Sequence, residues 1–197
     1  MQLLIATQNP GKKREFQELL QESGLDLLFL DDLDLKGFLF PEESGRTFQE
    51  NSSIKAKSLS EFTGIVSVAD DSGLSVEALD GFPGVVSARW LTGTDQDRID
   101  GLLQKMKLLT DRRAQFTCSI CLSIPSERKT LFFDGFQIGT IAEKPQGSNG
   151  FGYDPIFIPE GQTATYAELG SEYKNKHSHR AVALEKFKSY IKNTMVD

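Results

Sequence analysis

The sequence has few cysteines and histidines, and it has no excess of basic residues. Its 197 residues include two cysteines and two histidines, and 28 acidic residues against 22 lysines and arginines give a net charge of −6. Binding along a nucleic-acid backbone needs a basic surface, so the composition argues against a nucleic-acid partner. It leaves room for a small polyanion in a local cationic pocket.

Long apolar runs are also missing. No stretch approaches the roughly 18 residues of a membrane span, and the opening "MQLLIA" is too short for a signal peptide and lacks the charged start of one. We therefore predict a cytoplasmic protein with no membrane association. At about 150 residues per domain, residues 1–197 are expected to form a single domain.

The two cysteines lie in "FTCSICLSI", a C-x-x-C pattern that could indicate redox or zinc chemistry. Residues 114–124 alternate as a strand does, and side chains an odd number of positions apart on a strand face opposite sides of its sheet. Cys118 and Cys121 are therefore predicted to be core thiols on opposite faces.

Hydrophobic periodicity and turn residues predict an α/β fold. Early strands alternate with helices, which favours parallel pairing, and "PSER" joins two long strands as a hairpin, so the sheet should be mixed. The predicted strands are 2–6, 26–30, 65–70, 114–124, 129–140 and 153–158. The predicted helices are 12–22, 48–62, 95–109 and 178–192, with a turn-rich segment at 71–93.

The stretch "ATQNPGKKREF" places charges against the helix dipole. Asn9-Pro10-Gly11 is predicted to be a turn, and Lys12, Lys13 and Arg14 then begin a helix, where the dipole disfavours cations. An anion bound at this helix start would explain them. The pattern is not a Walker A loop, and a plain turn before a solvated basic helix is the alternative.

In "PEESGRTFQEN", Thr47 and Glu50 have the spacing of a capping box for the next helix. Glu42 and Glu43 precede that helix and are free to project. Lys55 lies on its first turns, which makes a second cationic helix start.

The stretch "IVSVADDSG" reads as an apolar strand ending at two aspartates. Because neighbouring strand residues face opposite sides, only one of Asp70 and Asp71 can point into a given cleft. Ligands of open α/β sheets bind near strand ends, and carboxylates suit Mg²⁺. An Asx-turn that terminates the strand is the alternative.

Two further motifs lie toward the C-terminus. In "GSNGFGYDP", glycines allow close backbone approach and Phe151 and Tyr153 offer faces for a planar base, although a hairpin turn with core aromatics fits equally. In "KHSHRAV", Ser178 can cap the last helix, which leaves His179 and Arg180 as a third cationic start. A metal pair of His177 and His179 is disfavoured, since no acid or thiol lies nearby in sequence.

Together these motifs describe a pocket for a nucleoside triphosphate with Mg²⁺. In order along the chain, "ATQNPGK", "TFQENSSIKA", "ADDSGL", "DGFPGVVSARW", "GFGYDPIF" and "SHRAVAL" resemble the motifs of the inosine triphosphate pyrophosphatases, enzymes of non-canonical purine nucleotides such as dITP and XTP. The resemblance spans nearly the whole chain.

The resemblance implies an elongated α/β fold with a mixed central sheet flanked by helices, two lobes with a substrate cleft between them, and a homodimer. It implies hydrolysis between the α- and β-phosphates with Mg²⁺, giving a monophosphate and pyrophosphate. Asp71 would be the catalytic base and, with Glu42, would serve the metal. The substrate would be bound by Thr7, Gln8, Asn9, Pro10, Gly11, Lys12, Lys55, Ser72, Phe151, Gly152, Tyr153, Asp154, Lys174, His179 and Arg180.

Selectivity is expected to depend on the O6 acceptor of inosine and xanthine. Donors such as His179 and Arg180 would pair with O6, whereas adenine offers an N6 donor at that position. Two alternatives remain open: a pyrophosphatase for other modified nucleotides, and a regulator that binds nucleotides without turnover.

Overall fold

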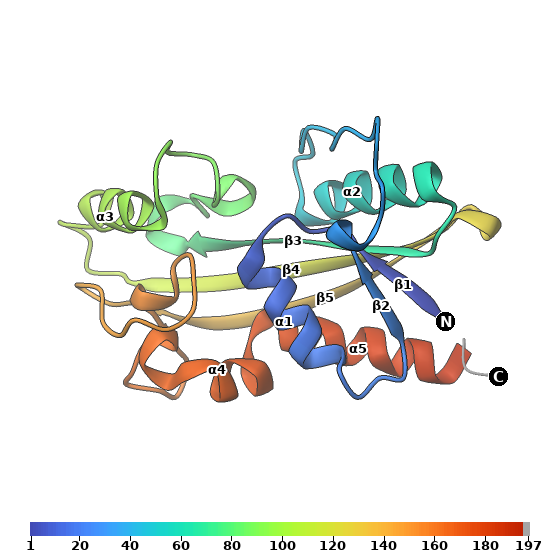
Figure 1. Cartoon of the computed structure of the whole chain (residues 1–197). Helices are drawn as coiled ribbons and strands as arrows, with labels where there is room; N and C mark the ends of the chain where they lie inside the picture. The colour runs from blue at the N-terminus through green and yellow to red at the C-terminus, as the bar shows by residue number, and fades with distance from the viewer. Residues whose placement is uncertain (195–197) are drawn as a thin grey trace. The chain divides into compact units, whose positions relative to one another are not determined.

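The computed structural model describes residues 1–194, and within them six strands form one sheet with helices on both faces (Figure 1). The strands are β1 (Gln2–Ile5), β2 (Asp26–Phe29), β3 (Ser67–Val76), β4 (Arg113–Ile124), β5 (Lys129–Ile141) and β6 (Phe157–Pro159). The α-helices are α1 (Pro10–Leu20), α2 (Phe48–Thr63), α3 (Asp95–Lys105), α4 (Tyr166–His177) and α5 (His179–Thr194). The strand order is β2-β1-β3-β4-β5-β6.

The sheet is mixed, as predicted. β1 runs parallel to β2, with Leu3 opposite Leu27, and parallel to β3. A parallel pair needs a crossover, which α1 provides between β1 and β2. β5 and β6 run antiparallel, with Thr140 opposite Ile158. Within residues 1–194, no helix combines the length and the apolar character needed to cross a lipid bilayer.

The chain divides into two compact units. Among the described residues, unit 1 comprises residues 1–71, 118–135 and 180–194, and unit 2 comprises residues 72–117 and 136–179. β3, β4 and β5 each contribute residues to both units, so the units do not follow one another along the chain.

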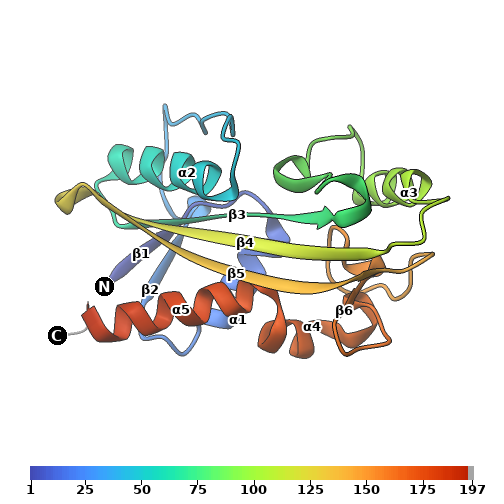
Figure 2. The same cartoon turned by 180° about the vertical axis from the view of Figure 1, so that it is seen from behind.

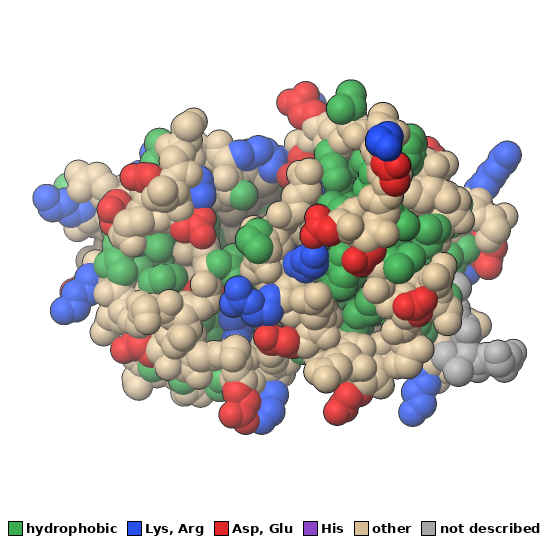
Figure 3. Space-filling view, viewed as in Figure 1, with side chains coloured by type: hydrophobic (Ala, Val, Ile, Leu, Met, Phe, Trp, Pro, Cys, Tyr) green, Lys and Arg blue, Asp and Glu red, His purple; other side chains and the backbone are tan. Residues whose placement is uncertain are grey.

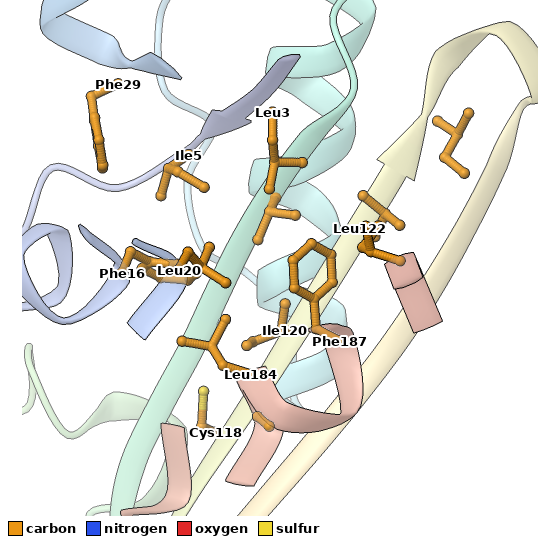
Figure 4. Close-up of a cluster of buried hydrophobic side chains, with 14 residues drawn as sticks. Leu3, Ile5, Phe16, Leu20, Phe29, Cys118, Ile120, Leu122, Leu184 and Phe187 are labelled. Atoms are coloured by element: carbon orange, nitrogen blue, oxygen red, sulfur yellow. The ribbon is translucent and has the colours of Figure 1, made fainter. Parts of the chain in front are cut away.

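In unit 1 the sheet is covered on both faces. Figures 1 and 2 show α2 over one face and α1 with α5 over the other. Leu3 and Ile5 of β1 pack with Phe16 of α1 and with Leu184 and Phe187 of α5 (Figure 4). Two buried faces explain why β1 reads as a continuous apolar run rather than as an alternating one.

The face under α2 is built from the intervening strand positions. Leu4 of β1 and Ala69 of β3 pack there with Ala56 and Leu59 of α2. Because successive strand side chains point to opposite faces, Leu3 and Leu4 fall into different clusters. β1 and β3 therefore lie between helices that carry the charged residues described below.

Unit 2 has its own aromatic core. Phe116 of β4 and Phe157 of β6 meet edge to face with ring centroids 4.7 Å apart, and Tyr166 of α4 lies 5.2 Å from Phe157. Ile99 and Leu102 of α3 belong to the same buried cluster. In Figures 1 and 2, α3 and α4 lie on opposite faces of the strands of this unit.

The prediction for the cysteines is confirmed. Cys118 belongs to the cluster under α1 and α5, and Cys121 belongs to the cluster under α2, so the two thiols face opposite sides of β4. Both are free and buried. Burial raises the pKa of Cys121 to about 12 and raises that of Cys118 as well, so neither thiol is an activated nucleophile.

Two predicted element boundaries are wrong. The predicted turn Asn9-Pro10-Gly11 is a cap followed by helix, since α1 begins at Pro10 with Asn9 as its N-cap. The predicted strand 65–70 does not end at its aspartates, because β3 continues through Asp70 and Asp71 to Val76. Carboxylates usually interrupt a buried strand, but here each one has a cationic partner.

The segment after the glycine-rich loop also differs from the prediction. The predicted strand 153–158 shrinks to β6, because a short 3₁₀ helix, η5 (Asp154–Ile156), precedes it. Helix α4 was not predicted from the sequence, although Thr165 and Glu168 form a capping box at its start. That T-x-x-E spacing was the available signal.

Candidate active site

The loop between β1 and α1 is shaped by its own side chains. Asn9 Oδ1 accepts the backbone N–H of Lys12 at 3.0 Å, and the Asn9 N–H donates to Thr7 Oγ1 at 3.2 Å. Pro10 fills the first helical position, where a missing N–H costs nothing. Gln8, Asn9 and Pro10 are exposed, and the first turn holds no acid. The positive end of α1 is therefore open to an anion.

The cations that begin α1 have different surroundings. Lys13 Nζ pairs with the exposed Asp31 at 2.6 Å, and Arg14 is exposed. Lys12 Nζ instead lies 3.0 Å from Oδ2 of the buried Asp70 in β3. The dipole of α1 disfavours the positive charge of Lys12, and Asp70 of β3 partly balances that charge.

A pocket of about 400 Å³ adjoins this loop in unit 1. Figure 3 shows hydrophobic side chains at the surface over the segment between β2 and α2, which supplies much of the lining. The lining residues are Thr7, Gln8, Pro10, Lys13, Leu30, Asp31, Leu35, Phe38 and Phe40. Thr7, Gln8 and Pro10 therefore border an apolar surface as well as the helix start.

Asp70 is an ion-pair partner rather than a proton acceptor. Arg180, at the start of α5, binds Asp70 Oδ2 with Nη2 at 2.8 Å and also pairs with Glu15 of α1. Burial alone would raise the pKa of Asp70, but Lys12 and Arg180 outweigh burial and hold the pKa of that carboxyl well below its usual range. Lys12 and Arg180 therefore favour the anionic form of Asp70.

Asp71 faces the other side of β3, toward α2. Its Oδ1 lies 3.4 Å from Lys55 Nζ, and its Oδ2 accepts a hydrogen bond from Asn51 Nδ2 at 3.2 Å. The partners of Asp70 come from α1 and α5, so the prediction that the adjacent aspartates point to opposite faces is confirmed.

Glu43 joins Asp71 around Lys55. Glu43 Oε1 lies 2.5 Å from Lys55 Nζ. The loop that carries Glu43 is tied to α2, because Asn51 Oδ1 accepts the Gly45 N–H at 2.8 Å. A Cβ at position 45 would lie 2.6 Å from that oxygen, so the close approach requires glycine. Asn51 thus links the acidic loop to Asp71.

This cluster shifts the pKa of its members. Burial raises the pKa of Asp71 above its ordinary value, with Lys55 and Lys12 opposing and Glu43 adding to the rise. Burial would lower the pKa of Lys55, but Asp71, Asp70 and Glu43 raise it overall. A carboxylate with a raised pKa is a better general base, and Lys55 keeps its charge.

The glutamate that joins this cluster is Glu43, whereas the family resemblance implies that Glu42 serves the metal. Glu42 is exposed, whereas Glu43 is half-buried and contacts Lys55. Two adjacent glutamates in a loop carry no periodicity that tells which one points inward. Among the described residues 1–194, no group of three or more His, Cys, Asp or Glu side chains is arranged to hold a metal, so any ion would need further ligands from substrate or water.

Unit 2 holds a second set of predicted residues. Lys174 of α4 is buried, and its Nζ lies 2.6 Å from Asp154 Oδ2 and 4.3 Å from the centroid of the Phe151 ring. Asp154 Oδ2 also accepts the Phe151 N–H at 2.8 Å. Phe151, Asp154 and Lys174 therefore form one cluster, in which a cation lies against a partly exposed aromatic face.

Two residues of the same motif have structural partners. The Tyr153 hydroxyl accepts a hydrogen bond from Trp90 Nε1 at 2.7 Å and donates to the Ser87 carbonyl at 2.9 Å, and Tyr153 is buried in the core of unit 2. The Gly152 N–H donates to Asp95 Oδ2 at 2.8 Å. Tyr153 therefore shapes the loop, and Phe151 presents the more accessible ring.

His179 and Arg180 are neighbours in sequence, but their side chains have different surroundings. His179 is buried and stacks on Phe116 in unit 2, with centroids 4.6 Å apart and planes within 6°. The Arg180 guanidinium belongs to unit 1, on Asp70 and Glu15. Ser72 is the residue of β3 that follows Asp71 and is half-buried.

The predicted residues thus fall into groups by unit. Unit 1 brings Lys12 and Arg180 together on one face of β3, where both contact Asp70, and brings Lys55 and Asp71 together on the other face. Unit 2 brings together Phe151, Asp154 and Lys174. Sequence reasoning missed Glu15, Glu43 and Asn51 as members of these clusters. The position of Glu15 three residues after Lys12 on α1 was the signal that the two share a helix face.

The fold and these clusters define a class of α/β protein. In unit 1 the start of α1 is suited to bind phosphate, and Lys55 of α2 forms a cluster with carboxylates, including Asp71 of β3. Residues 3–190 match the model of the Ham1 family. The chain belongs to the Ham1 family.

Relatives of known name and structure agree with that assignment. The dITP/XTP pyrophosphatase of Bacillus subtilis (strain 168) is 43% identical over 192 residues, which cover 95% of this chain and 96% of the relative. The Staphylococcus aureus Ham1 protein structure matches with a TM-score of 0.86 at 37% identity, covering 98% of this chain and 99% of the other. The Mycobacterium abscessus nucleoside-triphosphatase / dITP/XTP pyrophosphatase matches with a TM-score of 0.76 at 40% identity, covering 95% and 98%.

Proposed function

We propose that this chain is a nucleoside triphosphate pyrophosphohydrolase that converts ITP, dITP and XTP to the monophosphate and pyrophosphate, and so removes deaminated purines from the nucleotide pool. The observation that carries the proposal is the cluster of Asp71, Lys55 and Glu43, in which a buried carboxylate with a raised pKa lies beside a cation and a second carboxylate. Membership of the Ham1 family, with relatives named dITP/XTP pyrophosphatases, supports the substrate class.

In the proposed reaction, a water oxygen attacks the α-phosphorus. The bond from that phosphorus to the oxygen bridging the α- and β-phosphates breaks, and pyrophosphate leaves with this oxygen. Asp71 accepts the proton that the water gives up. Lys12, Lys55 and the positive end of α1 bind the phosphates and stabilise the charge that develops on the leaving group.

We propose Mg²⁺ as the cofactor, and the donor set fits it. Mg²⁺ takes oxygen ligands, usually one or two carboxylates with substrate phosphates and water. Asp71 and Glu43 both lie within 3.4 Å of Lys55 Nζ, so their oxygens share one small region. When bound there, Mg²⁺ would neutralise phosphate charge and lower the pKa of water.

Base recognition is assigned to the cluster of Phe151, Asp154 and Lys174. The partly exposed Phe151 ring offers a stacking face for a purine. An ammonium donates hydrogen bonds and accepts none, so Lys174 suits the O6 acceptor of hypoxanthine and xanthine and opposes the N6 amine of adenine. Asp154 fixes the Lys174 ammonium through their 2.6 Å contact. His179 keeps its proposed role as a further donor.

The test is product analysis across a panel of ITP, dITP, XTP, ATP and GTP, with and without Mg²⁺. We expect pyrophosphate, in equal amount to the monophosphate, with the deaminated purines preferred by orders of magnitude. Release of inorganic phosphate instead, or equal turnover of ITP and ATP, would overturn the proposal. Tight ITP binding without any product would make the chain a nucleotide-binding regulator.

We further propose a homodimer in the cytoplasm, which the family resemblance supports. Sedimentation velocity tests the assembly: a mass near twice the 21.9 kDa of the chain is expected, and a monomer at micromolar concentration would contradict it. Fractionation of cells that produce the native protein tests the location.

A further inference from the structure

Asp70 lies at the centre of an ion-pair network in unit 1. The proposed reaction gives Asp70 itself no role. Its Oδ2 accepts hydrogen bonds from Arg180 Nε at 3.2 Å and Nη2 at 2.8 Å, and it lies 3.0 Å from Lys12 Nζ. Arg180 also pairs with Glu15. Two acids and two bases balance within the network, which is what a buried cluster of charges needs.

The four members differ in their access to solvent. The side chains of Asp70 and Arg180 are each 1% exposed and that of Glu15 is 10% exposed, whereas Lys12 is 15% exposed. Lys12 is also the member that stands in the first turn of α1, next to the exposed residues Asn9 and Pro10. Of these four residues, Lys12 is therefore the one that can reach an anion from solvent.

We infer that Asp70 is a positioning residue, which holds the Lys12 ammonium at the start of α1 in the place where it binds the triphosphate. The inference rests on the proposed function, because the phosphate role of Lys12 belongs to that proposal. An ammonium has three donors, so Lys12 keeps one on Asp70 and directs the others away from the strand. Arg180 and Glu15 hold the Asp70 carboxylate in turn.

A fixed Lys12 reduces the conformational entropy lost when phosphate binds, since the side chain is ordered before the ligand arrives. A competing explanation gives Asp70 a purely structural role, in which it only balances Arg180. The two explanations differ in one respect: positioning acts through Lys12, and structural balance does not. A double-mutant cycle separates them.

The experiment uses calorimetry to measure the Kd of inorganic tripolyphosphate for the wild type, Asp70→Asn, Lys12→Ala and the double variant. The KM and kcat for ITP are measured for the same four proteins. We expect Asp70→Asn to weaken tripolyphosphate binding about tenfold, the scale of one lost charge-assisted contact. In the Lys12→Ala background the same change should alter Kd less than about twofold. Asp70→Glu, which keeps the charge, should restore most of the affinity.

Asp134→Asn is the matched control, because Asp134 is a strand aspartate of unit 1 whose carboxylate accepts Gln49 Nε2 at 2.7 Å outside the network. It should leave Kd unchanged. An equal loss on Asp70→Asn in both Lys12 backgrounds would overturn the inference. Tripolyphosphate binding does not depend on turnover, so a cycle that behaves as expected in a protein that fails to hydrolyse ITP would reject the proposed function alone.

A second measurement covers the case in which Asp70→Asn does not fold. In the unaltered protein, ¹⁵N NMR of the lysine ammonium groups should show slow proton exchange for Lys12 and fast exchange for Lys13, whose partner Asp31 is 82% exposed. Equally fast exchange for both lysines would show that Asp70 does not hold Lys12, and would reject the inference without any substitution at Asp70.

Discussion

In unit 1, charged side chains form clusters on both faces of β3, with acids and bases in chains of contacts: Lys12 to Asp70 to Arg180 on one face, and Glu43 to Lys55 to Asp71 on the other. In unit 2 the predicted site residues hold one buried ion pair, Lys174 with Asp154, and it lies against an aromatic ring. Dense charge suits phosphates and metal, whereas a single directed donor beside a flat apolar face suits a nucleobase.

Under the proposed function, residues of unit 1 carry out the phosphate chemistry and residues of unit 2 select the base. This division predicts that substitutions in unit 1 affect all nucleotides alike, because every nucleoside triphosphate carries the same phosphates. Substitutions in unit 2 should change the ratio between nucleotides.

Asp71→Asn should lower kcat for ITP by about 10²–10⁴, the usual contribution of a general base. Asparagine keeps the shape of the side chain but cannot accept the proton. The fold should remain, as judged by circular dichroism and the melting temperature. Activity within a few-fold of the wild type would remove Asp71 from the mechanism.

Glu43→Gln and Glu42→Gln form a matched pair of adjacent substitutions. Glu43→Gln should lower kcat/KM by about 10–100-fold at limiting Mg²⁺, the range typical when a residue that orients a metal is lost, because Glu43 contacts Lys55 in the Asp71 cluster. Glu42 is exposed, and its substitution should change little. The reverse order of effects would show that Glu42 serves the metal, as the family resemblance implies.

Gly150→Ala and Gly152→Ala test how the loop of unit 2 is built. Both glycines have positive φ, but a Cβ at Gly150 would overlap the Asp154 carboxylate, whereas a Cβ at Gly152 meets no atom within 4 Å. Gly150→Ala should cost more than the roughly 1 kcal/mol of an unfavourable backbone conformation, and Gly152→Ala about that amount. Thermal unfolding measures both, and equal losses would mean that the loop adapts around Asp154.

In the metal-free protein, substituting Lys55 and substituting Glu43 should shift the pKa of Asp71 in opposite directions. Lys55 lowers that pKa and Glu43 raises it, so Lys55→Met should shift it upward and Glu43→Gln downward. Because burial holds the folded pKa above the unfolded value, ionised Asp71 disfavours folding at pH above its folded pKa, and this cost vanishes as the pH falls below the unfolded value. Carboxyl ¹³C chemical shifts followed over pH measure the pKa, and shifts in the same direction would disprove the arrangement.

The sequence predicted most elements of the fold, because periodicity depends on local burial. The strand pattern correctly placed Cys118 and Cys121 on opposite faces, and it separated Asp70 from Asp71. It ended β3 too early, because a pair of aspartates is a strong local turn signal. Whether such a pair can stay inside a strand depends on cations from distant helices, which local patterns do not contain.

For the candidate site, the sequence indicated residue types but not the contacts that the side chains make. Lys12, Lys55 and Asp71 remain predicted site residues, and the sequence alone did not indicate that Asp70 pairs with Lys12. With Asp70 buried at 3.0 Å from Lys12 Nζ, we now expect Lys12→Ala to destabilise the protein. The choice between Glu42 and Glu43 likewise depends on the tether from Asn51 to Gly45.

The most direct test of the division between the units is the ratio of kcat/KM for ITP to kcat/KM for ATP, measured by pyrophosphate release for the wild type, Glu43→Gln and Lys174→Met. We predict a ratio of about 10⁴ or more in the wild type, as expected when a site leaves polar groups unpaired with the wrong substrate. Glu43→Gln should lower both values and keep the ratio, and Lys174→Met should lower the ITP value and collapse the ratio. A ratio that falls with Glu43→Gln and persists with Lys174→Met would contradict the account.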